Sequence, residues 1–112
     1  MKQKEIWLIN LDPSIGAEIR KTRPCVILND DSIGVLPLKV VAPITDYKEK
    51  YKVVPWMIQL IPDKLNNLGK ISVIDVFQMR SVSEKRLIRK LGVIREDDIL
   101  KAKEALKLVF GL

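Results

Sequence analysis

The amino-acid sequence predicts a mainly β protein with a single C-terminal helix, organised as one domain over residues 1–112. Short runs of β-branched and other apolar residues, separated by turn-forming residues, follow one another up to Ile94. After them the pattern changes to the periodicity of an amphipathic helix. Strands at this spacing, followed by one late helix, indicate a strongly bent sheet or a small barrel. Apolar residues make up 47% of the chain, which is enough for a buried core.

Six segments are predicted as strands because each is rich in β-branched residues and is bounded by turn signals. The first run ends at Asp12-Pro13, and the second ends at an Asn-Asp-Asp sequence. In chain order the predicted strands cover residues 6–11, 25–28, 35–44, 53–61, 71–79 and 91–94.

The end of the chain is predicted as a helix over residues 96–110. Three acidic residues open it and Gly111 closes it, in agreement with the helix dipole and with common capping residues. The apolar positions that fall on one face are Ile99, Ala102, Leu106, Val109 and Phe110. Ser81 and Glu84 also have the spacing of a capping box, which predicts a short helix over residues 84–90.

Charge and cysteine content limit the classes of protein that this chain can belong to. Lysine and arginine number 20 against 14 acidic residues, a net charge of +6 that suits either a polyanionic partner or simple solubility. Cys25 is the single cysteine, so no intrachain disulfide can form and a reducing compartment is expected. The sequence shows no signal peptide and no apolar stretch approaching the roughly 20 residues of a membrane span. These features predict a cytoplasmic protein with no membrane partner.

The sequence contains no histidine, which excludes Cys-His and Ser-His-Asp catalysis and an ordinary zinc site. A magnesium site made of oxygen ligands would need clustered acidic residues. Only residues 30–31 and 96–98 form such clusters, the first in a turn and the second at a helix start, where acidic residues are favoured for structural reasons. We therefore expect no metal and no cofactor.

Two loops contain the residues best suited to binding or catalysis. Residues 12–23 form a long connection that carries several charged side chains, and long loops are often functional. Residues 45–52 interleave Tyr47 and Tyr51 with lysines. Proteins that bind single-stranded nucleic acid use aromatic rings to stack on bases and cations to contact phosphates. From composition alone, both segments are equally compatible with ordinary solvated turns.

Several motifs in these regions are similar to those of one family. The sequences EIWLINLDP at residues 5–13, IGAEI at 15–19 and KTRPCVI at 21–27 resemble the opening of the MazF/PemK (Kid) toxins. Further on, VAPIT at residues 41–45 and FQMRSV at 77–82 resemble two later blocks of that family. The resemblance covers nearly the whole chain.

This resemblance implies a fold and an activity. The expected fold is an SH3-like small barrel of the MazF/PemK/CcdB type, assembled as a homodimer. The expected activity is that of a type II toxin, a sequence-specific, metal-independent endoribonuclease. It would cleave single-stranded RNA by attack of the ribose 2′-hydroxyl on the adjacent phosphorus. A cognate antitoxin with an acidic tail in the RNA groove is implied as well.

The resemblance also implies site residues. The arginine that precedes proline in the family is Arg23 here, and the threonine of the Pro-Ile-Thr block is Thr45; both are predicted to be catalytic. A guanidinium can bind phosphate oxygens through two hydrogen bonds, and a hydroxyl can donate a third. The residues predicted to bind RNA are Glu18, Arg20, Lys21, Thr22, Tyr47, Lys48, Lys50, Gln78 and Arg80. For Arg80 a structural ion pair at a dimer face is the alternative, and the general base is left unassigned, with Glu18 as a candidate.

The chain departs from the family pattern at a few positions, and two other functions are compatible with the same fold. Phe77 stands where many relatives carry an acidic residue, Asp75 lies two residues earlier, and Ser83 replaces a family aspartate. A CcdB-like, non-catalytic gyrase poison and a plain RNA-binding barrel are the alternatives, because a fold alone does not fix a function. The presence of Arg23 together with Thr45 favours the ribonuclease.

Overall fold

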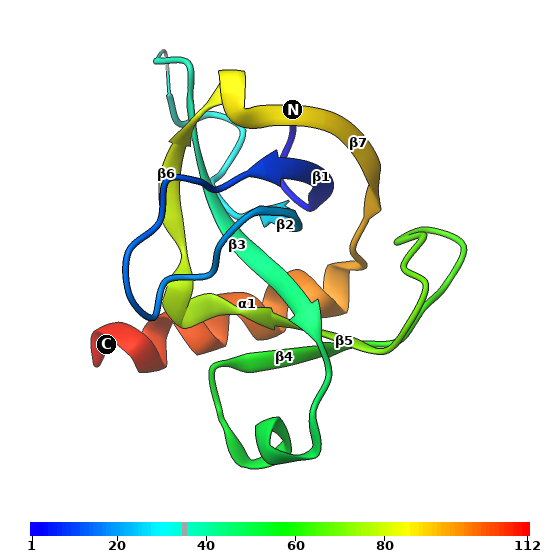
Figure 1. Ribbon diagram of the computed structural model, residues 1–112. Helices are drawn as coiled ribbons and strands as arrows, with labels where there is room; N and C mark the ends of the chain where they lie inside the picture. The colour runs from blue at the N-terminus through cyan, green and yellow to red at the C-terminus, as the bar shows by residue number, and fades with distance from the viewer. Residues whose placement is uncertain (35) are drawn as a thin grey trace.

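The computed structural model describes residues 1–34 and 36–112 and shows a bent antiparallel sheet with a helix at the C-terminus (Figure 1). The strands of this described part are β1 (Glu5–Asn10), β2 (Thr22–Ile27), β3 (Leu38–Asp46), β4 (Met57–Leu60), β5 (Ser72–Asp75), β6 (Arg80–Ser83) and β7 (Leu87–Val93). The helix is α1 (Glu96–Phe110), and single 3-10 turns occur at η1 (Glu49–Val53), η2 (Val76–Gln78) and η3 (Glu84–Arg86). No helix within residues 1–34 and 36–112 is long and apolar enough to cross a membrane.

Strand β3 is the centre of the sheet. The strand order is β4-β5-β3-β2-β1-β7, and β6 pairs with the first part of β3. Along β3 the partner changes from β6 to β2 and then to β5, so the sheet bends around this strand. The end strands β4 and β7 do not pair with each other in the part of the chain that the structure describes. The predicted class, mainly β with a C-terminal helix, is confirmed, although the sheet does not close.

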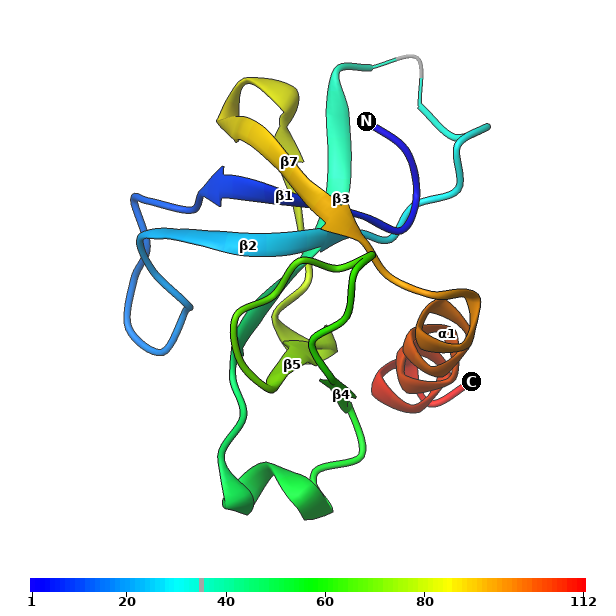
Figure 2. The same cartoon turned by 90° about the vertical axis from the view of Figure 1, so that its right-hand side faces the viewer.

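Helix α1 covers one face of the sheet, beside β4 (Figure 2). The side chains of Ile99, Ala102 and Ala105 are buried there. We call this cluster the helix-side core; it also contains Ile6, Val26, Leu28, Ala42, Ile44, Ile58, Leu60, Ile74, Val76 and Ile94. The helix begins where Asp98 Oδ2 accepts a hydrogen bond from the Arg95 amide at 3.1 Å, and it ends at Gly111, whose φ is +71°. The predicted helix over residues 96–110 is confirmed at both ends.

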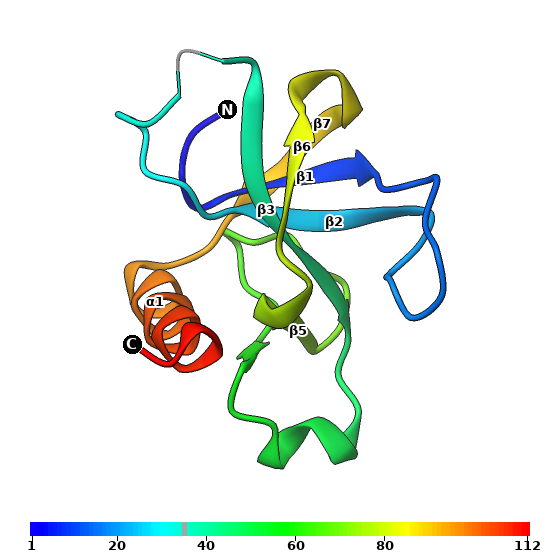
Figure 3. The same cartoon turned by 90° about the vertical axis from the view of Figure 1, so that its left-hand side faces the viewer.

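A second apolar cluster lies on the opposite face of β2. Because side chains alternate along a strand, Val26 faces the helix-side core while Cys25 and Ile27 face the other way. We call this cluster the loop-side core; its members are Ile9, Leu11, Cys25, Ile27, Val41, Val82 and Leu87. The loop between β1 and β2 extends from this side of the molecule, away from α1 (Figure 3).

The predicted helix over residues 84–90 is wrong. Residues Glu84–Arg86 form one 3-10 turn, and β7 starts immediately afterwards at Leu87. The reason is that β7 pairs with β1, which satisfies its backbone groups and buries Leu87 in the loop-side core. The serine that caps the turn is Ser83, whose Oγ accepts from the Lys85 amide at 3.2 Å, and not Ser81.

Other strand boundaries also differ from the prediction. Strand β3 begins at Leu38 and continues to Asp46, because Thr45 and Asp46 pair with β5; the predicted start, Val35, lies outside the described residues. The predicted strands over residues 53–61 and 71–79 shorten to β4 and β5, with η1 before the first and η2 after the second. Strand β6 was not predicted, and residues 91–94 are only the end of the longer strand β7.

Candidate active site

The pairing of β2 with β3 brings Arg23 and Thr45 to the same face of the sheet. Cys25 pairs with Pro43, and the predicted catalytic residues each lie two positions beyond that pair. Residues that face each other in an antiparallel ladder point to the same side, and so do residues two positions apart on one strand. Both side chains are half-buried. The register therefore places a guanidinium and a hydroxyl at neighbouring positions where β2 begins and β3 ends.

The side chain of Arg23 is oriented by the loop that precedes it. Its Nε donates a hydrogen bond to the carbonyl oxygen of Arg20 at 2.9 Å. Within residues 1–34 and 36–112 no hydrogen bond is formed by the two terminal nitrogens of this guanidinium. These nitrogens present the paired N–H groups with which arginine binds two phosphate oxygens.

Cys25 lies between Arg23 and Arg80 in the loop-side core. Burial raises the pKa of the Cys25 thiol to about 12, although the positive charges of Arg80 and Arg23 act in the opposite direction. The thiol therefore stays protonated at neutral pH and is part of the core. Arg80 lies on the same side of the sheet as Arg23, because Arg80 pairs with Val41 and Val41 pairs with Ile27, two residues from Cys25 and four from Arg23.

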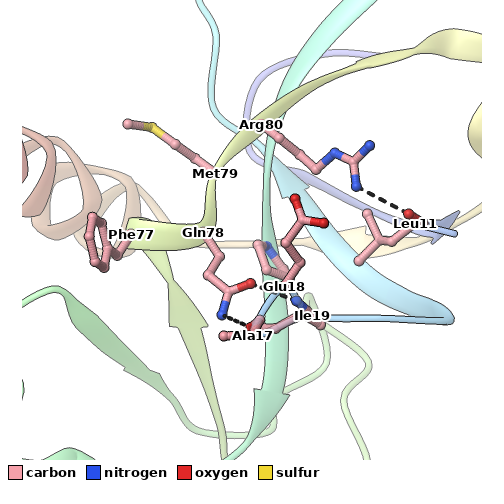
Figure 4. Close-up of a pocket in the computed structure, with 9 residues that line it drawn as sticks. Leu11, Ala17, Glu18, Ile19, Phe77, Gln78, Met79 and Arg80 are labelled. Atoms are coloured by element: carbon pink, nitrogen blue, oxygen red, sulfur yellow. Dashed lines mark hydrogen bonds between the residues drawn. The ribbon is translucent and has the colours of Figure 1, made fainter. Parts of the chain in front are cut away.

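Gln78 and Arg80, two of the predicted RNA-binding residues, are both hydrogen-bonded to the backbone of the first loop (Figure 4). Gln78 Oε1 accepts from the Ile19 amide at 2.7 Å, and Gln78 Nε2 donates to the Ala17 carbonyl at 3.2 Å. Arg80 Nη1 donates to the Leu11 carbonyl at 3.1 Å. These two side chains connect the segment after β5 to the loop between β1 and β2.

A cleft of about 480 Å³ lies between that loop and the segment after β5. It is lined by Leu11, Ala17, Glu18, Ile19, Pro43, Phe77, Gln78, Met79 and Arg80 (Figure 4). Glu18 is exposed, and its Oε1 accepts from the Ile15 amide at 2.6 Å. The cleft reaches β3 at Pro43, two residues before Thr45, and neither Arg23 nor Thr45 is among its lining residues.

The remaining predicted RNA-binding residues are on the surface of the two loops. Arg20, Lys21 and Thr22 are exposed at the end of the first loop, and Lys48 and Lys50 are exposed just after β3. The hydroxyl of Tyr47 donates to Glu49 Oε2 at 3.4 Å, and loss of hydration together with the charge of Glu49 raises the pKa of Tyr47. Glu49–Val53, predicted as part of a loop, forms η1.

Sequence reasoning treated Asp75 and Phe77 only as departures from a family pattern. The β3–β5 register, extended one residue past the Ile44–Ile74 pair, places Asp75 opposite Pro43. Asp75 is 5% exposed, its Oδ1 has no hydrogen-bond partner among the described residues, and burial raises its pKa. Phe77 is 63% exposed, and its ring packs edge-to-face on Trp56 with centroids 5.5 Å apart. The signal in the sequence that could have identified Asp75 is its position as a carboxylate at the end of an apolar strand.

Comparisons with known proteins agree with this geometry. Residues 2–110 match the family model of the PemK-like, MazF-like toxins of type II toxin-antitoxin systems. The chain is 34% identical to Endoribonuclease MazF of Staphylococcus epidermidis, over 100% of this chain and 92% of that protein. It is 29% identical to Endoribonuclease MazF9 of Mycobacterium tuberculosis, over 100% of this chain and 98% of that protein.

Solved structures share the fold. MazF from Deinococcus radiodurans superimposes with a TM-score of 0.81 at 23% identity, covering 100% of this chain and 97% of that one. An endoribonuclease from a mycobacterial species, solved in complex with its cognate antitoxin, gives a TM-score of 0.78 at 14% identity, covering 100% and 96%. The family match extends over almost every residue, and it includes the loop and strands that hold Arg23 and Thr45. This chain belongs to the PemK-like, MazF-like toxins of type II toxin-antitoxin systems.

Proposed function

We propose that this toxin is a sequence-specific, metal-independent endoribonuclease that cleaves single-stranded RNA at the face formed by Arg23 and Thr45. The observation that carries the proposal is the β2–β3 register, because Arg23 and Thr45 each lie two positions beyond the Cys25–Pro43 pair and so share one face of the sheet. Membership of the PemK/MazF family supports it, as do two relatives named as endoribonucleases. The family match does not favour the CcdB-like gyrase poison.

In the proposed reaction the ribose 2′-oxygen attacks the adjacent phosphorus, and the bond from phosphorus to the 5′-oxygen breaks. The products are a 2′,3′-cyclic phosphate and a 5′-hydroxyl, so one proton leaves the 2′-hydroxyl and one is gained by the 5′-oxygen. The terminal N–H groups of Arg23 stabilise the extra charge on the phosphorane, and the Thr45 hydroxyl donates a further hydrogen bond. Preorganised donors of this kind contribute about 3 kcal/mol each. Glu18 is the proposed acceptor of the 2′-hydroxyl proton.

The exposed cations on both loops are the proposed contacts to the RNA backbone. In the sequence, Arg20 and Lys21 precede Arg23, and Lys48 and Lys50 follow Thr45. Contacts to phosphates release counterions, so binding should weaken as salt increases. Tyr47 and Thr22 are the proposed contacts to bases or sugars, and Arg80, which lines the cleft, is a further proposed contact.

The proposed partners are a second copy of the chain and a cognate antitoxin. Helix α1 exposes Leu100, Leu108 and Phe110, and an apolar surface of this kind suits a homodimer. One structural neighbour was solved with its cognate antitoxin, and the net charge of +6 would attract an acidic tail into the RNA groove. We place the protein in the cytoplasm, with residues 1–112 acting as one domain.

The test is cleavage of a long RNA by the purified protein in excess EDTA. The wild-type protein should cut the RNA, and Arg23→Ala should lower the cleavage rate by about 100-fold or more. Arg89→Ala is the matched control, because Arg89 is exposed on β7 and the charge change is the same. Circular dichroism and size-exclusion chromatography check the fold and the dimer. Wild-type cleavage rates in a folded Arg23→Ala protein would contradict the assignment of the site.

A further inference from the structure

A chain of hydrogen bonds connects Gln78 to the guanidinium of Arg23. Gln78 Oε1 holds the amide of Ile19 at 2.7 Å, and Ile19 is followed directly by Arg20. The carbonyl oxygen of Arg20 accepts the Nε hydrogen of Arg23 at 2.9 Å. We propose that Gln78 is a positioning residue, which orients Arg23 through the backbone of the first loop. This inference rests on the catalytic role proposed for Arg23.

Both ends of the Gln78 amide are engaged in this clamp. The oxygen accepts from Ile19 while the nitrogen donates to Ala17, so the side chain spans the turn of backbone between these residues (Figure 4). The half-buried Gln78 closes η2, immediately before β6. Because one N–H and one lone pair of this amide are committed to the backbone of the loop, the side chain is held in a fixed orientation against the loop.

The loop depends on this contact because its other hydrogen bonds are mostly local. Ser14 Oγ donates to the Ile19 carbonyl at 3.3 Å and Arg20 Nη2 donates to the Gly16 carbonyl at 3.4 Å, both within the loop. In the described part of the chain, apart from the bond between Arg23 Nε and the Arg20 carbonyl, Gln78 supplies the hydrogen bonds that join residues 15–20 to an element outside the loop. Without them the Arg20 carbonyl, which orients Arg23, would no longer be fixed relative to β3 and Thr45.

This arrangement predicts a specific kinetic effect. A misplacement of about 1 Å at a reacting group can lower a rate by about 100-fold. Removing the clamp with Gln78→Leu should therefore lower kcat by about 10- to 100-fold. The KM for RNA should change by less than about threefold, because the exposed lysines that contact phosphates are untouched. Gln78→Glu keeps the acceptor for Ile19 and loses the donor to Ala17, so it should recover part of the lost kcat.

The decisive measurement is made on the protein without RNA. In ¹⁵N NMR spectra, the Ile19 amide and the Arg23 Nε–H should be protected from hydrogen exchange in the wild-type protein. In Gln78→Leu both should exchange at least about tenfold faster, a change that corresponds to about 1.4 kcal/mol of local opening. Gln59→Leu is the matched control, because Gln59 is exposed on β4 and forms no side-chain hydrogen bond in the described residues. Its signals and its kcat should equal those of the wild type.

A second test measures the energetic coupling between Gln78 and Arg23 with a double variant. Arg23→Lys keeps a positive charge but has no Nε–H for the Arg20 carbonyl. If Gln78 acts through Arg23, adding Gln78→Leu to Arg23→Lys should change kcat by less than about twofold.

The outcomes separate this inference from the proposed function. Unchanged exchange of Ile19 and Arg23 in a folded Gln78→Leu protein, together with lost cleavage, would mean that Gln78 contacts RNA, and would overturn the positioning role. A wild-type kcat in Gln78→Leu would overturn it too. Faster exchange in Gln78→Leu, with no RNA cleavage by the wild-type protein, would confirm the clamp and contradict the proposed function instead.

Discussion

Two loops of equal length are held in different ways. Residues 11–21 join β1 to β2 and residues 61–71 join β4 to β5, and in each case the strands so joined are antiparallel neighbours. The β4–β5 loop is organised around its own buried side chain. The β1–β2 loop is held by long side chains that reach it from β6, η2 and η3.

Asn66 is the internal anchor of the β4–β5 loop. It is 2% exposed, its Nδ2 donates to the Ile61 carbonyl at 2.9 Å, and its Oδ1 accepts from the amides of Asp63 and Leu68 at 3.0 Å each. The loop also lies directly on Gly92 of β7, where the Val93 amide donates to the Leu65 carbonyl at 2.9 Å. Buried, fully bonded polar groups of this kind make a segment rigid.

The β1–β2 loop keeps its backbone in place with groups that can be displaced. Gln78, Arg80 and Arg86 donate to carbonyl oxygens of this loop, those of Ala17, Leu11 and Asp12, while the loop tip around Gly16 and Glu18 is exposed. Long side chains can release a loop at a lower free-energy cost than a buried amide can. From this difference we expect that the site loop can adjust around a ligand more easily than the β4–β5 loop can. The four changes below test that difference.

The largest effect is expected from Gly92→Ala, which acts on the rigid loop. A Cβ at this position would lie 2.4 Å from the Leu65 carbonyl oxygen and 2.7 Å from that of Asn66. Because both obstacles are backbone atoms, the variant should lose about 3 kcal/mol in the free energy of unfolding. Urea denaturation measures the loss, and Gly69→Ala, with open space around its Cβ, is the matched control with an expected change below about 1 kcal/mol. Equal stability of the two variants would contradict the close packing of this loop.

Asn66→Ala should have the next largest effect. It leaves the Ile61 carbonyl and the amides of Asp63 and Leu68 without their side-chain partner, and should destabilise the fold by about 2 kcal/mol. The kcat for RNA cleavage should stay within about twofold of the wild type at a temperature where both proteins are folded, because the Asn66 side chain forms its hydrogen bonds with Ile61, Asp63 and Leu68 and none with Arg23 or Thr45 in the described residues. A large fall in kcat with little loss of stability would reverse the roles assigned to the two loops.

What could be predicted from the sequence depends on whether the signal is local or comes from contacts between residues far apart in the chain. The helix over residues 96–110 was predicted because its periodicity, its acidic start and Gly111 are local signals. Arg23 and Thr45 were predicted to be catalytic through family motifs, and this role stays a prediction, while the β2–β3 register puts both residues on one face of the sheet. The clamp made by Gln78 joins residues far apart in sequence, and no local pattern reports such a contact. The first part of β7, residues 87–90, was predicted as a helix because the spacing of Ser81 and Glu84 outweighed the pairing of this segment with β1, which local signals do not reveal.

Asp75→Asn tests whether the buried carboxyl of Asp75 lowers the free energy of unfolding at neutral pH. Burial raises the pKa of Asp75, so its folded form favours the protonated carboxyl, and the stability that this provides is lost as pH rises through the folded pKa. Asparagine stays neutral, and its amide can replace the oxygen that has no partner. The variant should match the wild type below about pH 3.8 and gain about 1 kcal/mol in the free energy of unfolding at pH 7. Urea titrations at several pH values measure the difference, and a gain that does not depend on pH would rule out the titration of Asp75 as its cause.

The smallest effect on stability is expected from Arg86→Met, which loosens one external tether of the site loop. Arg86 Nη1 donates to the Asn10 carbonyl at 3.1 Å and also to that of Asp12, while its aliphatic part can be replaced by methionine. Because these carbonyls lie near the surface and can bind water instead, the variant should lose only about 0.5 kcal/mol in the free energy of unfolding. Proteolysis within residues 12–21 should nevertheless become several-fold faster, because local opening needs less free energy than global unfolding. Arg89→Met removes an exposed arginine from β7 without touching the loop, and its cleavage pattern should equal that of the wild type. If Arg86→Met instead unfolded the protein as severely as Gly92→Ala, both loops would be equally part of the rigid fold, and adjustment of the first loop around a ligand would have to be abandoned.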